Sequence, residues 1–252
     1  MIDAKTRAEW LSKIKKDGYN LKEADTSIKQ DKEIVLAAVK HNGIYLEYAD
    51  DSLKKDKEVV LVAVKNSKFD DHPSGRALSY ADISLKKDKE IVLAAVTNDV
   101  RALQYADASL TKDKSFVLLA VKIQGIALEY IDNSLNKDKE IVLAAIKQDG
   151  NALQYANGNL QKAKEFVFIA FANMDITSYG AEPILKKIQN QIWLKELFKR
   201  LASNTNYSTN FNLCYELANS IYTNLEDKIW SNKLYEKSVN LAQEPEHYRE
   251  LF

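Results

Sequence analysis

The chain repeats one short segment of sequence several times, and this repetition constrains its fold more than any other feature. The segment Asp-Lys-Glu-Ile-Val-Leu-Ala-Ala-Val begins at Asp31 and returns, with few changes, at Asp56, Asp88, Asp113 and Asp138. The intervals between these aspartates are 25, 32, 25 and 25 residues. A period of about 20–50 residues is typical of an array in which each unit packs against the next. We therefore expect a stack of similar units along most of the chain.

The first half of each unit is predicted to form a helix. The carboxylate of Asp31 can accept hydrogen bonds from the free N–H groups at a helix start, and Glu33 suits the positive end of the helix dipole. The apolar run 34–39 follows, and Gly43 is expected to end the helix in a left-handed conformation. Because the run leaves almost no polar stripe, we expect neighbouring segments to cover this helix on all sides.

The second half of each unit predicts a shorter helix, because Leu46, Ala49 and Leu53 share a face at helical spacing. A leucine-rich repeat has a similar period, and the first apolar run would then be a strand. The paired alanines Ala37 and Ala38, the capping aspartate and the missing L-x-x-L-x-L-x-x-N pattern favour a helix instead. The expected fold is all-α: an α-solenoid of two-helix repeats of about 25 residues, with a C-terminal helical hairpin cap.

The period predicts three regions. Residues 1–30 are expected to form a degenerate N-terminal capping repeat, since their apolar residues keep the register of the next unit. Residues 31–175 are expected to form the helical repeat array, whose one long interval holds an insertion within 67–75. Residues 176–252 lose the period and are expected to form a C-terminal helical domain.

Charge and hydropathy exclude several classes of protein. The 36 Lys and Arg residues balance 36 Asp and Glu residues, which argues against a nucleic-acid partner held by excess positive charge. The sequence has no apolar run long enough for a membrane span, and residues 1–7 lack a secretory signal pattern. We expect no membrane insertion, and a cytoplasmic location or delivery as an effector without a general secretory signal.

No group of residues indicates catalysis or a cofactor. Cys214 is the single cysteine, and its apolar helical context predicts a buried structural thiol. His72 stands next to Asp70 and Asp71, but these three lack the fixed spacing of a metal site. The other carboxylates recur in every unit as helix caps. The sequence therefore predicts a protein that is not an enzyme and that holds no cofactor or metal.

Two columns of side chains recur once per unit. A tyrosine column could stack on bases or on a peptide, but packing between repeats with the hydroxyl at the rim is the preferred interpretation. A lysine column is interpreted as one part of a solvated, mutually compensating charged face. The tyrosines are Tyr48, Tyr80, Tyr105, Tyr130 and Tyr155, and the lysines are Lys55, Lys87, Lys112, Lys137 and Lys162.

The positions that differ between units are the candidate partner-binding site. In repeat arrays such positions often form one binding surface, although unconstrained solvent positions also vary. The candidates are the residues that end each first helix and the inserted loop: His41, Asn42, Asn66, Phe69, Asp70, Asp71, His72, Asn98, Asp99, Ile123, Gln124, Gln148 and Asp149.

The repeats resemble a known family. The segments 31–39 and 88–96, together with Ala-Leu-Gln-Tyr-Ala at 102–106 and 152–156, look like the bacterial and protist repeat called domain of unknown function 4116. The resemblance covers about residues 25–175, and that family has no common activity to transfer. Downstream of it, the segment Asp227–Lys237 resembles the second helix of bacterial tetratricopeptide-like hairpins.

The function expected from the sequence is a protein–protein interaction module whose partner is another protein, with no nucleic acid bound. One alternative is a dedicated antagonist of a single target, such as an immunity protein or a secreted effector. A second alternative, from another class, is an enzyme with its site in residues 176–252, although that region offers no clustered His, Cys or Asp.

Overall fold

The computed structural model describes residues 2–67 and 76–174, and all the regular structure within these two stretches is helical. The expectation of an all-α chain is confirmed there, and the strand of a leucine-rich repeat is absent from both stretches. The expected C-terminal hairpin, Cys214 and most of the insertion lie outside the described residues. The chain divides into two compact units, Met1–Leu135 (unit 1) and Asn136–Phe252 (unit 2), and the three regions expected from the period stay a prediction.

One long helix begins most repeats. The long helices are α1 (Ala4–Lys16), α3 (Lys32–His41), α5 (Lys57–Lys65), α6 (Lys89–Asn98), α8 (Lys114–Ile123), α9 (Lys139–Gln148) and α11 (Lys164–Ala172).

The second half of a repeat is not the single short helix that the spacing predicted. It contains a 3-10 helix and then, in most repeats, one turn of α-helix. The 3-10 helices are η1 (Gly18–Glu23), η2 (Gly43–Tyr48), η3 (Arg76–Tyr80), η4 (Leu85–Lys87), η5 (Val100–Tyr105), η6 (Gly125–Glu129) and η7 (Gly150–Tyr155). The short helices are α2 (Thr26–Lys29), α4 (Asp51–Lys54), α7 (Ala108–Thr111) and α10 (Gly158–Gln161).

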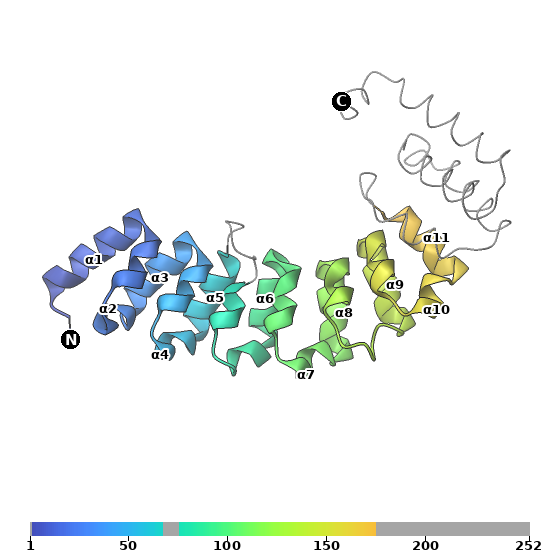
Figure 1. Cartoon of the computed structure of the whole chain (residues 1–252), viewed down its shortest axis with the longest axis horizontal. Coiled ribbons are helices and arrows are strands. Elements are labelled where there is room, and N and C mark those ends of the chain that lie inside the picture. Colours follow the sequence, from blue (N-terminus) through green and yellow to red (C-terminus); the bar gives the residue numbers. More distant parts are fainter. Residues whose placement is uncertain (1, 68–75, 175–252) are drawn as a thin grey trace, which may run out of the picture. The chain divides into compact units, whose positions relative to one another are not determined.

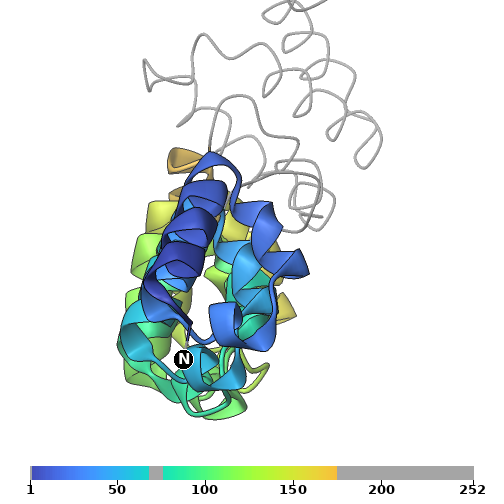
Figure 2. The same ribbon diagram turned by 90° about the vertical axis from the view of Figure 1, so that its left-hand side faces the viewer.

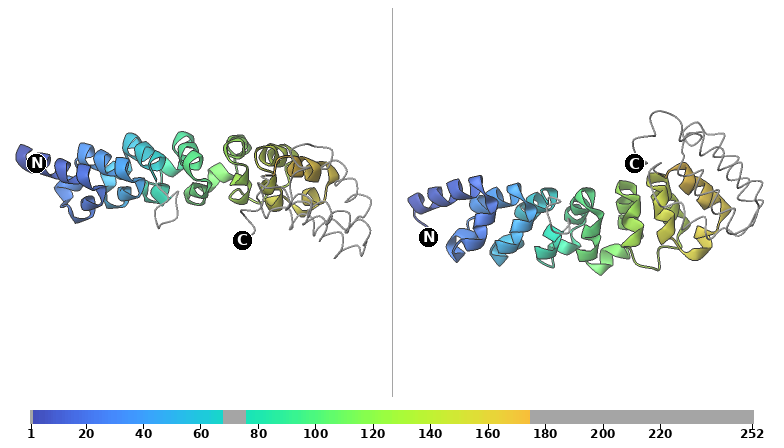
Figure 3. Two further views of the ribbon diagram at one scale, coloured as in Figure 1. Left: turned by 90° about the horizontal axis from the view of Figure 1, so that it is seen from above. Right: turned by 45° about the horizontal axis from the view of Figure 1, so that its top comes forward.

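The helices of unit 1 pack in sequence order (Figure 1). Helix α1 contacts α3, α3 contacts α5, α5 contacts α6 and α6 contacts α8, while η1, η2, η3, η5 and η6 contact one another in the same order. Figures 2 and 3 show this succession from the end at which α1 lies and from above. In unit 2, α9, η7 and α11 pack against one another.

The core comes from the same four positions of each repeated long helix. In α3 they are Ile34, Val35, Ala38 and Val39, all fully buried, and Leu46 of η2 joins them. The expectation that neighbours cover this helix on all sides is wrong. Its other two apolar residues stay half-buried, because positions three and four residues apart share a helix face and these two face outward.

Gly43 is required for a reason other than the expected one. Asn42, with extended backbone at φ −154°, ends α3, and Gly43 opens η2. The Gly43 N–H donates to the Asn66 carbonyl at 3.0 Å, and a Cβ on Gly43 would lie 1.8 Å from the Ala63 carbonyl oxygen. Glycine therefore allows the next long helix to approach closely, and no left-handed turn is involved.

The capping aspartates do more than start helices. The Asp56 carboxylate accepts from the N–H groups of Glu58 (2.9 Å) and Val59 (3.1 Å), as a helix cap does. Lys32 of the preceding repeat donates to Asp56 at 2.7 Å and pairs with Glu58 at 2.8 Å. Burial raises the pKa of Asp56, but the hydrogen bonds from Lys32 and from the backbone outweigh it and hold this pKa below its ordinary value.

This arrangement, which we call the cap ladder, recurs along unit 1. Its members are the pairs Arg7–Asp31, Lys32–Asp56, Lys57–Asp88 and Lys89–Asp113. Arg7 thus occupies in α1 the place that Lys32 occupies in α3, which shows that the first helix keeps the register of the repeats.

A backbone hydrogen bond joins consecutive repeats at their short helices. The donor is the N–H of the residue that precedes the short helix or turn, and the acceptor is a carbonyl of the preceding repeat. In unit 1 the bonds run from Asp50 to Lys29, Asp82 to Lys54, Asp107 to Lys86 and Asp132 to Thr111, at 3.0–3.1 Å.

Candidate functional site

The positions predicted to contact a partner lie where the long helices end. His41, Asn98, Ile123 and Gln148 are the last residues of α3, α6, α8 and α9, and Asn66 follows the last residue of α5. The adjacent candidates Asn42, Gln124, Asp99 and Asp149 precede the 3-10 helices. Phe69, Asp70, Asp71 and His72 lie outside the described residues.

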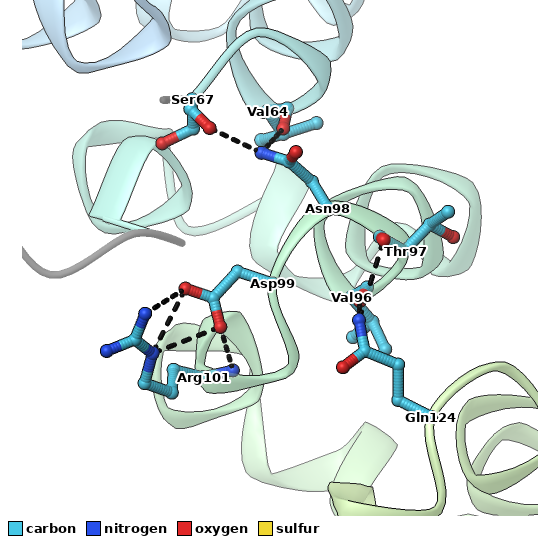
Figure 4. Close-up of polar contacts among 8 residues, drawn as sticks. All are labelled: Val64, Ser67, Val96, Thr97, Asn98, Asp99, Arg101 and Gln124. Atoms are coloured by element: carbon cyan, nitrogen blue, oxygen red, sulfur yellow. Dashed lines mark hydrogen bonds and ion pairs between the residues drawn. The ribbon is translucent and has the colours of Figure 1, made fainter. Parts of the chain in front are cut away.

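Part of this column caps the 3-10 helices. The side chains of Asn42, Asp99 and Asp149 each accept the N–H of the residue two positions later, at 3.2, 2.9 and 2.9 Å. Asn42 and Asp99 are buried, at 9% and 5% exposure. Asp99 also pairs with the Arg101 guanidinium at 3.0 Å (Figure 4). These positions differ in sequence between repeats, and their side chains nevertheless have a structural role as caps.

Other members of the column join consecutive long helices. The Asn98 amide donates to the carbonyls of Val64 (3.2 Å) and Ser67 (2.7 Å) at the end of the preceding long helix (Figure 4). The Gln124 amide donates in the same way to the Val96 carbonyl at 2.7 Å. In these joints a side chain reaches back and satisfies carbonyls that the helix end leaves free.

A second kind of joint uses glycine. Asn66 accepts the Gly43 N–H through its backbone carbonyl and turns its amide back to the Val62 carbonyl of its own helix, at 2.8 Å. In unit 2 the Gly150 N–H donates to the Asn173 carbonyl at 2.9 Å. The residue at this position therefore differs between repeats partly because some repeats are joined through a side-chain amide and others through a glycine N–H. A partner-binding role for this column stays a prediction.

Partly exposed apolar side chains of unit 1 recur elsewhere, along the outer face of its long helices. They are the fifth and sixth residues after each capping aspartate, and we call them the apolar row: Leu36, Ala37, Leu61, Val62, Leu93, Ala94, Leu118 and Leu119. All are half-buried except Leu119, which is 49% exposed. Because the helices that carry them pack in order, the row crosses α3, α5, α6 and α8.

A surface groove lies at the α1 end of the apolar row. Its volume is about 540 Å³, and its lining is Leu11, Lys15, Glu33, Leu36, Ala37, Lys40 and His41. Leu11 occupies in α1 the place of Leu36 in α3, so the groove lies between two adjacent repeats. Its lining combines apolar side chains with a few charged ones, the usual composition of a binding groove.

The charges beside the apolar row are not balanced locally. Glu33 is the only acidic residue that lines the groove, and its carboxylate already pairs with Arg7 at 2.6 Å. On the other side of the row lie exposed lysines, one helical turn after Leu11, Leu36, Leu61 and Leu118, and these lysines form no ion pair with any residue in 2–67 or 76–174. We call them the lysine row: Lys15, Lys40, Lys65 and Lys122.

The tyrosine column is half-buried beside the 3-10 helices. Tyr48 contacts Tyr19 of the preceding repeat edge-on, with ring centroids 6.1 Å apart. Burial raises the pKa of Tyr48, Tyr80 and Tyr130, and a neighbouring carboxylate raises each further, Glu47 for the first two. Rings packed in this way are not free to stack on a base.

The lysine column expected from the sequence, which we call the second lysine column, pairs across repeats in unit 1. Lys55, Lys87 and Lys112 lie 4.0, 3.8 and 3.8 Å from the carboxylates of Asp82, Asp107 and Asp132, one repeat further on. The compensation that the sequence predicted thus exists, but it involves the next repeat rather than the adjacent capping aspartate.

Residues 2–67 and 76–174 contain neither a metal-ligand cluster nor a helix that could span a membrane. No group of three His, Cys, Asp or Glu side chains there could hold a metal ion. None of the helices in the same stretches has the length and apolar character needed to cross a membrane.

Comparison with known families gives one match. The model of the family described as Domain of unknown function (DUF4116) matches residues 11–50, 31–70, 74–111 and 113–161. The chain belongs to this family. No curated protein and no solved structure matches the chain significantly. The resemblance seen in the sequence is therefore confirmed, and the DUF4116 repeats begin earlier, at residue 11.

The apolar row is the feature that our sequence interpretation missed. A run of six apolar residues suggested a helix buried on every side. The signal against this was present, because Glu33 precedes Leu36 by three residues and Lys40 follows it by four. Residues at these spacings share one helix face, so two charged neighbours mark Leu36 as outward-facing.

Proposed function

We propose that this DUF4116 chain is a non-enzymatic α-solenoid whose apolar row binds another protein. The observation that carries the proposal is the row itself, four neighbouring helices with leucines at equivalent outward positions. Single exposed apolar residues are common on protein surfaces, whereas a continuous series is typical of a binding surface. The groove between α1 and α3 supplies a concave starting point for such contact.

The charge arrangement supports a protein partner over a nucleic acid. Binding to a phosphate backbone needs a surface with excess positive charge. In the cap ladder and in the second lysine column, basic side chains already have acidic partners in the next repeat. The lysine row remains, but it borders leucines that a phosphate backbone would leave in contact with water.

The proposal is tested by affinity capture with the full chain from its native source. One variant carries Leu36→Ser, Leu61→Ser and Leu93→Ser, and the matched control carries Ile83→Ser, an isoleucine that is 62% exposed away from the row. We expect at least one protein to bind the wild type and the control but not the triple variant. Circular dichroism checks that all three chains are folded. The proposal fails if no captured protein depends on the row.

A further inference from the structure

We infer that the apolar row takes an acidic amphipathic segment of the partner, with apolar residues seated between the long helices and carboxylates facing the lysine row. This inference rests on the proposed function and adds the chemistry of the partner. It starts from the two edges of the row, which differ in their charge balance although both carry charged residues.

The acidic edge is neutralised within the chain. Glu33, Glu58 and Glu90 pair with Arg7, Lys32 and Lys57 of the preceding helix, at 2.6, 2.8 and 2.8 Å. A basic partner would have to displace these cations. In α8 the equivalent position is Ser115, which carries no charge. This edge therefore offers little attraction to a cationic segment.

The opposite edge is positive and unmatched within the part of the chain that the structure describes. Lys15, Lys40, Lys65 and Lys122 are exposed and form no ion pair there, and Thr97 takes the equivalent place in α6. Each lysine lies one turn from its leucine, so a ligand over the leucines brings its flanking groups to these ammonium groups. Complementary rim charges of this kind direct partner choice and association rate.

The geometry suits a peptide segment better than a lipid surface. Helices and proteins that insert into a membrane interface present projecting bulky apolar side chains. Here Leu11 and Leu36 are half-buried and line a groove of about 540 Å³. Packed helices lie about 8–10 Å apart, so a helix of about 20 residues, roughly 30 Å long, reaches across four of them.

The test is a selection with the full chain as bait and a displayed library of random peptides, each about 20 residues long. We expect the enriched peptides to combine Leu, Ile or Phe at helical spacing with Asp or Glu on one flank. Binding is then measured by fluorescence anisotropy with synthetic copies of these peptides. We expect the Lys40→Glu, Lys65→Glu, Lys122→Glu variant to bind them at least about tenfold more weakly.

A matched control carries the same charge change elsewhere. The variant with Lys55→Glu, Lys87→Glu and Lys112→Glu alters the second lysine column, and it should bind the peptides as the wild type does. Circular dichroism confirms that both variants are folded. Higher salt should weaken binding to the wild type, since exposed charges are screened.

The outcomes separate the two proposals. Peptides that need Leu36, Leu61 and Leu93, but show no acidic preference and tolerate the Lys40, Lys65 and Lys122 changes, would overturn this inference and leave the proposed function in place. Row-dependent flotation with phosphatidylserine vesicles, or row-dependent dimerisation in sedimentation, would overturn it in favour of a lipid or a second copy. If no enriched peptide depends on the row, this inference falls, and the affinity capture with the Leu36, Leu61 and Leu93 variant decides the proposed function separately.

Discussion

At the scale of single residues, the joints between repeats are specific where the sequence looks variable. Gly43 admits the end of the next long helix, while Asn98 reaches back to the end of the preceding one. Glycine returns at the position of Gly43 in most repeats, with Val100 as the exception, whereas the residue at the position of Asn98 varies. At both positions the choice of residue is restricted by the neighbouring repeat, whose long-helix end lies close to Gly43 and supplies the carbonyls that Asn98 binds.

Replacement of Gly43 tests the close approach. We expect Gly43→Ala to lower the free energy of unfolding by about 2–3 kcal/mol, because a Cβ 1.8 Å from the Ala63 carbonyl oxygen forces the helices apart. The control is Gly158→Ala, where a Cβ meets no atom within 4 Å and should leave stability unchanged or slightly raised. Thermal unfolding followed by circular dichroism measures both. Equal melting temperatures for the two variants would contradict the argument.

Replacement of Asn98 tests the side-chain joint. Asn98→Ala leaves the carbonyls of Val64 and Ser67 without this donor, and we expect a loss of about 1–2 kcal/mol in urea unfolding. The adjacent Thr97 is exposed, and its hydroxyl donates within its own helix, to the Leu93 carbonyl; because Thr97→Ala removes only this hydroxyl, it should be close to neutral. A larger effect at Thr97 than at Asn98 would contradict the assignment.

At the scale of helices, α11 lacks one feature that the earlier long helices share. Ala163 has the backbone of a cap, φ −78° and ψ 121°, and differs little from Asp56 at −78° and 115°. It has no side-chain oxygen to accept the first N–H groups. The backbone at this cap position is therefore the one that aspartate adopts in the other repeats, but the residue is alanine.

Restoring that aspartate should stabilise the chain. We expect Ala163→Asp to raise the free energy of unfolding by about 1 kcal/mol, the usual contribution of a helix cap. Ala163→Leu, which has no acceptor, is the control and should give no gain. Differential scanning calorimetry reads both variants. A gain from Leu equal to that from Asp would show that capping is not the cause.

The caps, the long helices and the register of α1 could be predicted from sequence because each depends on residues close together in the chain. The division of the second half into η2 and α4 could not, since a 3-10 turn and an α turn differ by one hydrogen-bond step and share the same apolar spacing. The role of Gly43 depended on a helix 20 residues later. The outward position of Leu36 was predictable from Glu33 and Lys40, but the run of six apolar residues was given more weight and suggested a helix buried on every side.

At the scale of the whole molecule, the cap ladder makes stability depend on pH. Hydrogen bonds from Arg7, Lys32 and Lys57 outweigh burial and lower the pKa of Asp31, Asp56 and Asp88 below 3.8, and Lys89 lowers that of Asp113. In the folded state these carboxyls therefore bind protons less readily than in the unfolded chain. Their stabilisation is present above pH 3.8 and is lost as the pH falls through the lower folded values.

Urea unfolding at several pH values measures this dependence. We expect a nearly constant midpoint from about pH 8 to 5 and a steep fall below about pH 4. A variant with Asp31, Asp56 and Asp88 replaced by Asn should start from a lower midpoint and lose less on acidification. An equal acid dependence in the variant and the wild type would assign the effect to other carboxyls.

The backbone bond from each short helix to the preceding repeat has a consequence for how such chains change in length. A repeat inside the array both donates one N–H backward and offers one carbonyl forward, as Asp107 and Thr111 do within a single repeat. A duplicated copy of residues 88–112, inserted after Lys112, would find an acceptor before it and a donor after it. Unequal recombination between the repeats of such a gene can therefore add or remove whole units without leaving any of these backbone groups unmatched.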